Sequence, residues 1–347
     1  MRWENLTAND SGASAARAAP PLPLALPGAI ARTFDTPGFA GMTFYEIQAK
    51  SIINKVPAAS RMSFTWTINP YRGCSHACRY CFARNTHTYL DLDAGQDFDS
   101  RVIVKVNAGS LLRRELSARR WSREHIAMGT NVDCYQRAEG RYRLMREILS
   151  ALRDFANPFS ILTKGTLILR DLDLLRQAAD VTQVSLAVSI GFVDEALWRA
   201  VEPGTPSPKR RLDVVRQLTD AGFAVGVLVA PILPGLSDDD ASIEATVAAL
   251  ASAGAASATP LPLHLRPGAR EWYLRWLAGT RPELVPRYRA LFRDGSYSPA
   301  GYQREVCARV RAAARRYGIG GAEPDEGHRG TVAPPPAPPE PIQLTLL

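Results

Sequence analysis

The sequence predicts an α/β fold: a partial (β/α)6, TIM-like barrel with a C-terminal helical extension and flexible N- and C-terminal tails. Two observations lead to this prediction. Short apolar, β-branched runs alternate with helical patterns over roughly 200 residues, which is typical of a parallel sheet flanked by helices. After His264 the pattern becomes helical and contains several tryptophans and tyrosines. In barrels of this kind the chemistry gathers at the carboxyl ends of the strands.

The expected strands are short, apolar runs that are often β-branched. They span residues 64–69, 102–106, 125–128, 159–163, 184–190, 223–230 and 258–264. The helical patterns between them span residues 110–118, 137–156, 172–179, 209–221 and 238–253. Gly222 stands where a helix would end and release the chain into the next strand. The three aspartates at 238–240 suit a helix N-cap and a first helical turn.

Composition divides the chain into four regions. Residues 1–60 form an N-terminal arm or extension that begins rich in alanine and proline, and residues 61–265 form the barrel. Residues 266–319 form a basic helical extension. Residues 320–347 form a disordered tail in which six of the eight residues from 334 to 341 are proline, a composition typical of an extended spacer.

Overall composition excludes several classes of protein. Of the 347 residues, 46% are hydrophobic and 22% are charged, which are ordinary values for a globular chain and exclude wholesale disorder. Prolines interrupt the best apolar run, residues 225–236, so it falls short of the ~20 residues of a membrane span. Four prolines within residues 20–31 spoil a secretion signal. We therefore expect a soluble, cytoplasmic protein without a membrane partner.

The excess positive charge is concentrated in the C-terminal third. The whole chain carries a net charge of +8, and between Arg266 and Arg316 there are twelve arginines against four acidic residues, again a difference of +8. Two interpretations are open. The segment contacts an anionic polymer such as DNA or RNA, or it is a solvated helical surface.

Three of the five cysteines, Cys74, Cys78 and Cys81, follow the first predicted strand with the spacing C-x3-C-x2-C. Three thiolates on one tight loop can bind three corners of an iron–sulfur cube and leave one iron open to a substrate or cofactor. The alternative is a structural zinc site with His76 as a fourth ligand. Its usual second pair of ligands is missing from the sequence.

This segment resembles the cluster-binding motif of the radical S-adenosylmethionine (SAM) superfamily, C-x3-C-x-aromatic-C, with Tyr80 at the aromatic position. The resemblance implies a [4Fe–4S] cluster and SAM as cofactors, and a one-electron donor such as a flavodoxin or ferredoxin. The open iron would chelate SAM, and reduction would cleave the sulfonium to give a 5′-deoxyadenosyl radical that abstracts a hydrogen atom from substrate. The cofactor carries this chemistry, while the protein orients it.

Within the superfamily, the chain from about residue 65 to 234 is most similar to the spore photoproduct lyase-like branch, often called DNA repair photolyases. That resemblance implies that Asp133, Lys164 and Ser189, each at a predicted strand end, contact SAM. The segment 202–206 with Arg211 also resembles this branch, and its role, packing or cofactor contact, is left open.

One position departs from the branch. The place of the cysteine that donates a hydrogen atom in spore photoproduct lyase is held here by Thr130, and Cys134 lies four residues later in the same loop. Cys134 is therefore either an alternative hydrogen-atom donor or a small buried residue without a catalytic task. The departure puts repair of the spore thymine dimer itself in doubt.

The last five residues, Gln343-Leu344-Thr345-Leu346-Leu347, resemble the pentapeptide that binds the bacterial sliding clamp. In that motif a glutamine and a terminal pair of hydrophobic residues fill two pockets, so the resemblance assigns the contact to Gln343, Leu344, Leu346 and Leu347. The other interpretation is a tail that packs on its own domain.

The expected function is that of a radical SAM enzyme acting on damaged or modified DNA. The alternatives are a radical SAM enzyme acting on a protein, an RNA or a small molecule, and a non-enzymatic iron–sulfur or zinc module that binds nucleic acid.

Overall fold

Six parallel strands in sequence order form the body of the protein, as the alternating pattern predicts. The structure is a computed structural model that describes residues 28–57, 60 and 62–320. Its larger sheet has the order β11-β10-β9-β8-β7-β4-β3, in which β3 alone is antiparallel to its neighbour. The strands are β3 (Ile53–Lys55), β4 (Trp66–Ile68), β7 (Ile126–Met128), β8 (Phe159–Thr163), β9 (Val184–Ser189), β10 (Val225–Ile232) and β11 (Ser257–Pro262).

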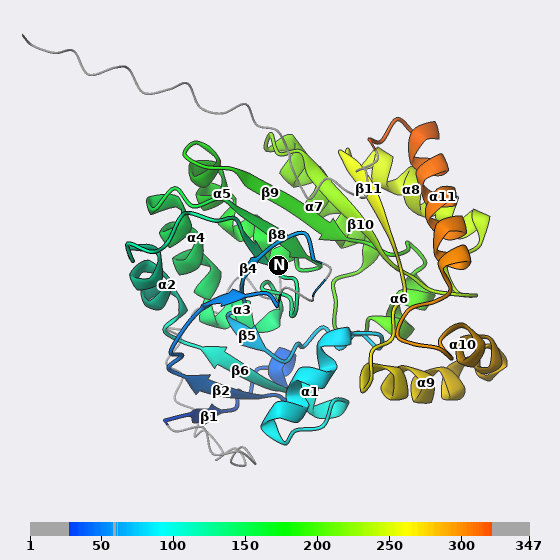
Figure 1. Cartoon of the computed structure of the whole chain (residues 1–347), viewed down its shortest axis with the longest axis horizontal. Coiled ribbons are helices and arrows are strands. Elements are labelled where there is room, and N and C mark those ends of the chain that lie inside the picture. The colour runs from blue at the N-terminus through cyan, green and yellow to red at the C-terminus, as the bar shows by residue number, and fades with distance from the viewer. Residues whose placement is uncertain (1–27, 58–59, 61, 321–347) are drawn as a thin grey trace, which may run out of the picture.

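Helices between these strands cover the outside of the curved sheet, which makes it a partial barrel (Figure 1). They are α2 (Ala108–Leu116), α3 (Arg137–Tyr142), α4 (Leu144–Asp154), α5 (Leu172–Ala179), α7 (Pro208–Asp220) and α8 (Asp240–Ser252). The short helix α6 (Glu195–Val201) follows β9 and packs in a separate, smaller core. The 3-10 helix η3 (Thr166–Asp171) precedes α5. Apolar faces of these helices and both faces of the strands form the main core.

Local sequence signals set the ends of several helices. The Asp239 side chain accepts a hydrogen bond from the Ser242 N–H at 2.9 Å, so it caps α8, and Asp240 occupies the first turn. Ser207 caps α7 in the same way, ahead of Pro208. Gly222 adopts φ +96° after α7, as expected for a residue that ends a helix.

A second, four-stranded sheet corrects one expectation. The segment predicted as a strand at 102–106 is a strand, β6 (Arg101–Lys105), but it lies outside the barrel sheet. It pairs in parallel with β2 (Thr43–Ile47), in the order β1-β2-β6-β5 with β1 (Ile30–Arg32) and β5 (Tyr71–Arg72). An apolar run in the sequence indicates that a strand is buried, but not which strand it pairs with. The parallel partner of β6 is β2, which comes from the N-terminal segment.

The helix predicted at 137–156 is two helices, because Arg143 between α3 and α4 adopts φ +53°. The buried side chain of Glu139 explains the break. Its carboxylate accepts hydrogen bonds from the Met145 N–H at 3.1 Å, the Tyr71 hydroxyl at 2.6 Å and Arg170 at 2.6 Å. This interaction caps the start of α4 from the preceding turn.

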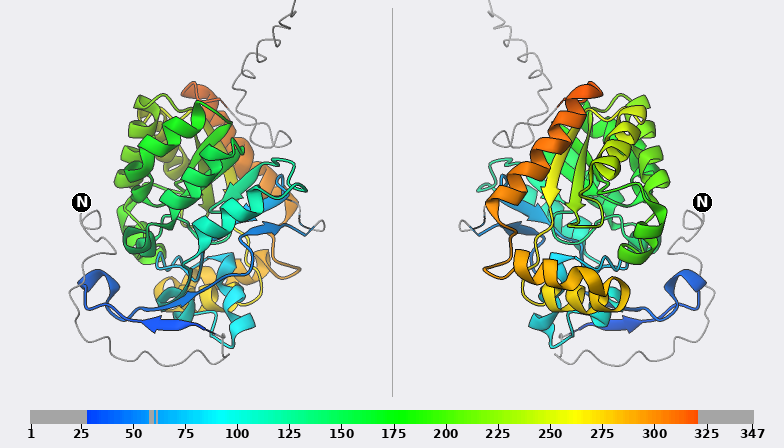
Figure 2. Two further views of the ribbon diagram at one scale, coloured as in Figure 1. Left: turned by 90° about the vertical axis from the view of Figure 1, so that its left-hand side faces the viewer. Right: turned by 90° about the vertical axis from the view of Figure 1, so that its right-hand side faces the viewer.

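The C-terminal helices fall into two groups. The helix α11 (Ala300–Arg316) lies along the edge strand β11 and joins the main core through Val306 and Val310 (Figure 2). The helices α9 (Ala269–Thr280) and α10 (Val285–Leu291), linked by η4 (Pro282–Leu284), form a separate small core with Phe192 and Val201.

The small sheet and the α9–α10 pair lie together below the barrel in Figure 1. Between them run the 3-10 helix η2 (Phe82–Leu90) and α1 (Gln96–Ser100), while η1 (Pro37–Phe39) precedes β2. No helix of the described residues is long and apolar enough to cross a membrane.

Candidate active site

The three clustered cysteines lie on one loop, residues 73–81, called here the cysteine loop. It leaves β5 at Gly73 and ends at Cys81, the residue before η2. Gly73 adopts φ +85°, and a Cβ at this position would lie 2.7 Å from the carbonyl oxygen of Arg101. Only glycine fits here, so the chain enters the loop in a fixed direction.

Two buried polar side chains hold the backbone of the cysteine loop. The Arg84 guanidinium donates to the Cys78 carbonyl through Nε at 3.2 Å and Nη2 at 2.9 Å. The Gln136 amide accepts from the Ser75 N–H at 2.9 Å and donates to the Gly73 carbonyl at 2.9 Å. The protein's own hydrogen bonds therefore place the thiols.

The thiols themselves are shielded from water. Cys74 and Cys78 are buried and Cys81 is half-buried. Burial raises the pKa of all three, and the charge of Asp133 raises that of Cys74 further, as the charge of Glu202 does for Cys78. Thiolates in such surroundings need a cationic partner, and bound iron would supply one.

The geometry does not support the alternative of a zinc site with His76. The His76 Nδ1 lies 3.4 Å from Asp133 Oδ2, and burial lowers the pKa of this imidazole. Within the described part of the chain, no group of three or more His, Cys, Asp or Glu side chains is placed to hold a single metal ion. In an iron–sulfur cube each thiolate binds its own iron, so the thiolates do not converge on one ion. Three thiols on one fixed loop, two of them buried and one half-buried, fit that arrangement.

Asp133 connects the ends of two neighbouring strands. Its Oδ1 accepts hydrogen bonds from the Tyr135 N–H at 2.8 Å and the Thr163 hydroxyl at 2.7 Å. Its Oδ2 accepts from the Lys164 N–H at 2.7 Å. These contacts hold the loop after β7 against the carboxyl end of β8, next to the cysteine loop.

Lys164 lies at the centre of a second group of polar contacts. Its Nζ is 2.5 Å from the Ser189 hydroxyl at the end of β9 and 3.9 Å from Glu202 Oε1. The same ammonium lies 6.0 Å from the centroid of the Tyr80 ring, within reach of a cation–π attraction. Residues from two strand ends, the cysteine loop and the turn after α6 therefore meet at one point.

Glu202 links this group to the body of the protein. The Tyr80 hydroxyl donates to its Oε1, and Arg211 donates to its Oε2 at 2.6 Å and to the Ser189 carbonyl at 2.8 Å. Both Glu202 and Arg211 are 0% exposed. Burial by itself raises the pKa of Glu202, but Arg211, Lys164 and Tyr80 together outweigh it, so the pKa lies below its usual value. Glu202 therefore stays ionised and positions Tyr80 and Lys164.

The turn after Glu202 also contacts the cysteine loop directly. The Gly204 N–H donates to the His76 carbonyl at 3.1 Å, and a Cβ on Gly204 would lie 2.1 Å from the Ser75 carbonyl oxygen. The segment 202–206, whose role the sequence leaves open, is therefore a packing and positioning element in this structure.

The structure brings Tyr80, Asp133, Lys164 and Ser189 together beside the three cysteines. Cys134 is 0% exposed and packs in the main apolar core, where burial raises the pKa of its thiol. Thr130, by contrast, lies at the end of β7 with its hydroxyl 3.1 Å from that of Thr67 on β4. The donor role of Cys134 stays a prediction.

Sequence reasoning missed two side chains that support the site, Arg84 and Gln136. It also missed the contact between His76 and Asp133. The available signal was weak: Arg84 and Gln136 bond mainly to backbone groups of the cysteine loop, and His76 contacts a side chain 57 residues away. No spacing rule connects such residues.

A parallel partial barrel with a three-cysteine loop after its first strand defines an iron–sulfur enzyme class that uses SAM. The family model of the radical SAM superfamily matches residues 68–245, and the chain belongs to this superfamily. It is therefore a radical SAM enzyme. Membership of this family implies SAM and an iron–sulfur cluster as cofactors.

Several relatives share the sequence. Uncharacterized proteins of Mycobacterium tuberculosis and Mycobacterium bovis are each 47% identical over 332 residues, which cover 93% of this chain and 94% of theirs. An uncharacterized protein of Methanocaldococcus jannaschii is 31% identical over 195 residues, covering 56% of this chain and 69% of its own.

Among solved structures, spore photoproduct lyase complexed with dinucleoside spore photoproduct has a TM-score of 0.60 to this chain. The match covers 80% of each chain at 17% identity, so it shows a shared fold. A mutant of the same lyase with bound AdoMet and dinucleoside spore photoproduct matches equally well, with a TM-score of 0.60 at 17% identity over 80% of this chain and 79% of its own.

Proposed function

We propose that this enzyme holds a [4Fe–4S] cluster through Cys74, Cys78 and Cys81 and uses it to cleave SAM reductively. The observation that carries the proposal is the position of the cysteine loop, whose His76 and Tyr80 lie next to Asp133 and Lys164 at the carboxyl ends of the barrel strands. Ser189 is bonded in turn to Lys164. When bound, the cluster and SAM supply reductive C–S bond cleavage and hydrogen-atom abstraction.

The surrounding residues would bind and orient SAM. The Lys164 ammonium can pair with the methionyl carboxylate, and the Ser189 hydroxyl beside it can accept or donate a further hydrogen bond. Asp133 Oδ2 can accept from the amino group or the ribose. Tyr80 is held by its hydrogen bond to Glu202 and lies next to Cys81 in the chain. Its ring would line one side of the SAM site and limit the entry of water.

We propose damaged or modified DNA as the substrate. Two observations support it: the shared fold with a lyase solved in complex with a dinucleoside spore photoproduct, and the excess of arginines in the C-terminal third. A protein, an RNA or a small molecule is the alternative substrate. A non-enzymatic metal-binding module is disfavoured by the superfamily assignment.

The test is anaerobic reconstitution of the full chain with iron and sulfide, followed by reduction with dithionite and assay of 5′-deoxyadenosine. We expect a brown protein that releases 5′-deoxyadenosine, with cofactor consumption increased by ultraviolet-irradiated oligonucleotides. A colourless, zinc-loaded protein would contradict the proposal, and stimulation by a non-nucleic substrate alone would contradict the DNA part.

Replacing any one cluster ligand gives the sharpest prediction. Cys74→Ala, Cys78→Ala and Cys81→Ala each remove one thiolate, so iron content and 5′-deoxyadenosine release should fall to background. The matched control is Cys307→Ala on α11, which should keep both. Retained activity in any of the three loop variants would refute the ligand assignment.

We also propose two protein partners for this enzyme. A flavodoxin or ferredoxin would supply the electron. The sliding clamp would bind Gln343, Leu344, Leu346 and Leu347, which lie outside the described residues, and a clamp-bound tail would raise the local concentration of the enzyme at DNA. Deleting residues 343–347 should abolish co-purification with the clamp, and unchanged co-purification would exclude the tail as the contact.

A further inference from the structure

Three aromatic rings lie in series next to the end of the cysteine loop, with Tyr297 stacked on His264 and Phe82 tilted beyond it. The ring centroids of Tyr297 and His264 are 5.5 Å apart with planes at 25°, and those of His264 and Phe82 are 5.5 Å apart with planes at 35°. Phe82 directly follows Cys81, and the Arg266 guanidinium lies 5.3 Å from the centre of its ring. We call these three rings the aromatic ladder.

The outer ring of the aromatic ladder is open to solvent. Tyr297 is 59% exposed, although large aromatic side chains usually bury most of their surface. A backbone bridge between Tyr297 and His264, and the Leu265 N–H donating to the Ser296 carbonyl at 2.7 Å, hold the two segments together. The exposed face of Tyr297 is therefore presented on a fixed support.

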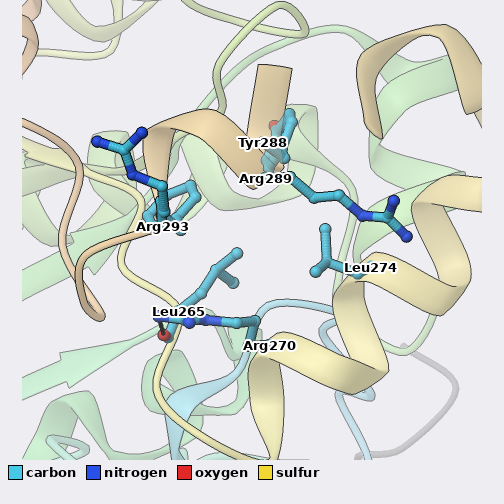
Figure 3. A pocket seen from close by; sticks show the side chains of 7 residues that line it. Leu265, Arg270, Leu274, Tyr288, Arg289 and Arg293 are labelled. Atoms are coloured by element: carbon cyan, nitrogen blue, oxygen red, sulfur yellow. Dashed lines mark hydrogen bonds between the residues drawn. The ribbon is translucent and has the colours of Figure 1, made fainter. Parts of the chain in front are cut away.

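A cavity lined by arginines adjoins the aromatic ladder. It has a volume of about 140 Å³ and lies between α9, α10 and the segment that carries Leu265. Figure 3 shows Arg270 on one side of it and Arg289 and Arg293 on the other, with Leu265, Leu274 and Tyr288 also lining it. Because Leu265 lines the cavity and its neighbour His264 belongs to the ladder, the two features share one extended segment.

The charges around this cavity are poorly neutralised. Arg289 forms no ion pair with the described residues, and Arg293 pairs only with Asp294, where both side chains are about four-fifths exposed. Such exposed pairs contribute little and open readily. Arg270 donates to the Leu265 carbonyl at 3.5 Å and to the Gly295 carbonyl, while its buried Nε has no partner in the described part of the chain.

Two of the five arginines of α11 have structural partners. Arg309 pairs with Asp240 at 2.7 Å and Arg316 pairs with Glu244, which joins α11 to α8. Part of the charge on α11 is therefore neutralised, whereas the cavity arginines have no ion pair among the described residues apart from the exposed pair of Arg293 with Asp294.

We infer that the aromatic ladder and the arginine-lined cavity together bind single-stranded DNA beside the active site, with a base stacked on Tyr297 and a backbone phosphate at the cavity. This inference rests on the proposed DNA substrate and specifies how it is held. Aromatic faces that stack bases and a cationic groove that follows the backbone are the two elements of single-strand recognition. When a base leaves the duplex to reach a buried active site, the DNA around it is unpaired and can be held as a single strand.

The phosphate part is tested by charge removal. The double variant Arg289→Ala, Arg293→Ala of the cluster-loaded full chain should bind a fluorescein-labelled 12-mer of single-stranded DNA more weakly. The slope of log affinity against log salt should fall by about one per lost phosphate contact. The control Arg119→Ala, Arg120→Ala changes the charge equally in an exposed turn after α2, on the far side of the molecule in Figure 1, and should leave the affinity and slope unchanged.

The stacking part is tested at Tyr297. Tyr297→Ala should weaken binding about 5- to 100-fold and abolish the quenching of a 2-aminopurine base placed in the oligonucleotide, whereas Tyr297→Phe should retain both. Equal losses in both variants, or losses without any change in quenching, would overturn the stacking role. Tighter binding of the matched RNA oligonucleotide would overturn the assignment to DNA.

The outcome is separable from that of the proposed function. Release of 5′-deoxyadenosine by the wild-type enzyme without DNA tests the cluster chemistry, while anisotropy and 2-aminopurine fluorescence test only the interface. Wild-type binding by both the arginine and the tyrosine variants would refute this inference and leave the cluster chemistry standing. Iron content, measured on every variant, confirms that each one is loaded.

Discussion

At the scale of single residues, the site depends on a buried charge rather than on its exposed groups. The Glu202 carboxylate neutralises the charge of the buried Arg211 guanidinium and at the same time orients Tyr80 and Lys164. A buried ion pair adds little net stability, but removing one partner leaves the other charge unpaired at a high cost.

We therefore expect Glu202→Gln to lower the free energy of unfolding by about 3 kcal/mol, because Arg211 loses its counter-ion in the interior. The control is Glu195→Gln on α6, whose exposed pair with Arg199 should cost less than ~0.5 kcal/mol. Urea unfolding under argon, followed by circular dichroism, measures both. Equal costs would show that burial of the pair is unimportant.

The same residue predicts a pH dependence. The folded state lowers the pKa of Glu202 despite its burial, because Arg211 and Lys164 favour the carboxylate. Its contribution to stability is therefore fully present above the unfolded value of ~4.3 and is lost as the pH falls through the lowered folded pKa. The stability difference between wild type and Glu202→Gln should be constant near neutrality and shrink in acid below about pH 4. A difference that persists unchanged in acid would contradict this assignment.

At the scale of elements, the turn after α6 acts as a brace for the cysteine loop. Gly204 is the contact point, because its Cα faces the Ser75 carbonyl with no room for a side chain. The local sequence identifies Gly204 only as part of a turn, whereas the close approach of two loops makes glycine obligatory.

Gly204→Ala should therefore displace the cysteine loop and reduce the iron retained after reconstitution to less than half of the wild-type content. The control is Gly301→Ala near the start of α11, where an added Cβ meets no atom within 4 Å. That change should keep the iron content and stabilise the helix by up to about 1 kcal/mol. Full iron loading of Gly204→Ala would show that the brace is dispensable.

At the scale of the whole molecule, α11 closes the open edge of the partial barrel. It packs on β11 and α8 and contributes Val306 and Val310 to the main core. An incomplete barrel has an edge strand with unpaired backbone groups and apolar side chains, which invites aggregation unless another element covers it.

Deleting residues 300–347 should therefore give a protein that aggregates, because the β11 edge and the buried face of α8 become exposed. Deleting residues 321–347 keeps every described contact of α11 and should leave the protein monodisperse and its melting temperature within 2 °C or so of wild type. Size-exclusion chromatography and thermal unfolding distinguish the two. A monodisperse shorter chain would show that α11 is not needed to close the barrel.

The sequence by itself predicted the alternating fold and the cysteine loop with Tyr80, and its resemblance to a known branch of the superfamily indicated Asp133, Lys164 and Ser189. These features are local, since hydrophobic period and residue spacing are fixed by neighbours along the chain. Only the tertiary structure decided that β6 pairs outside the barrel, that Cys134 is buried in the core, and that Glu202 and Arg211 brace the site. These features join segments distant in sequence, and such pairings follow from packing of the whole chain rather than from any local pattern.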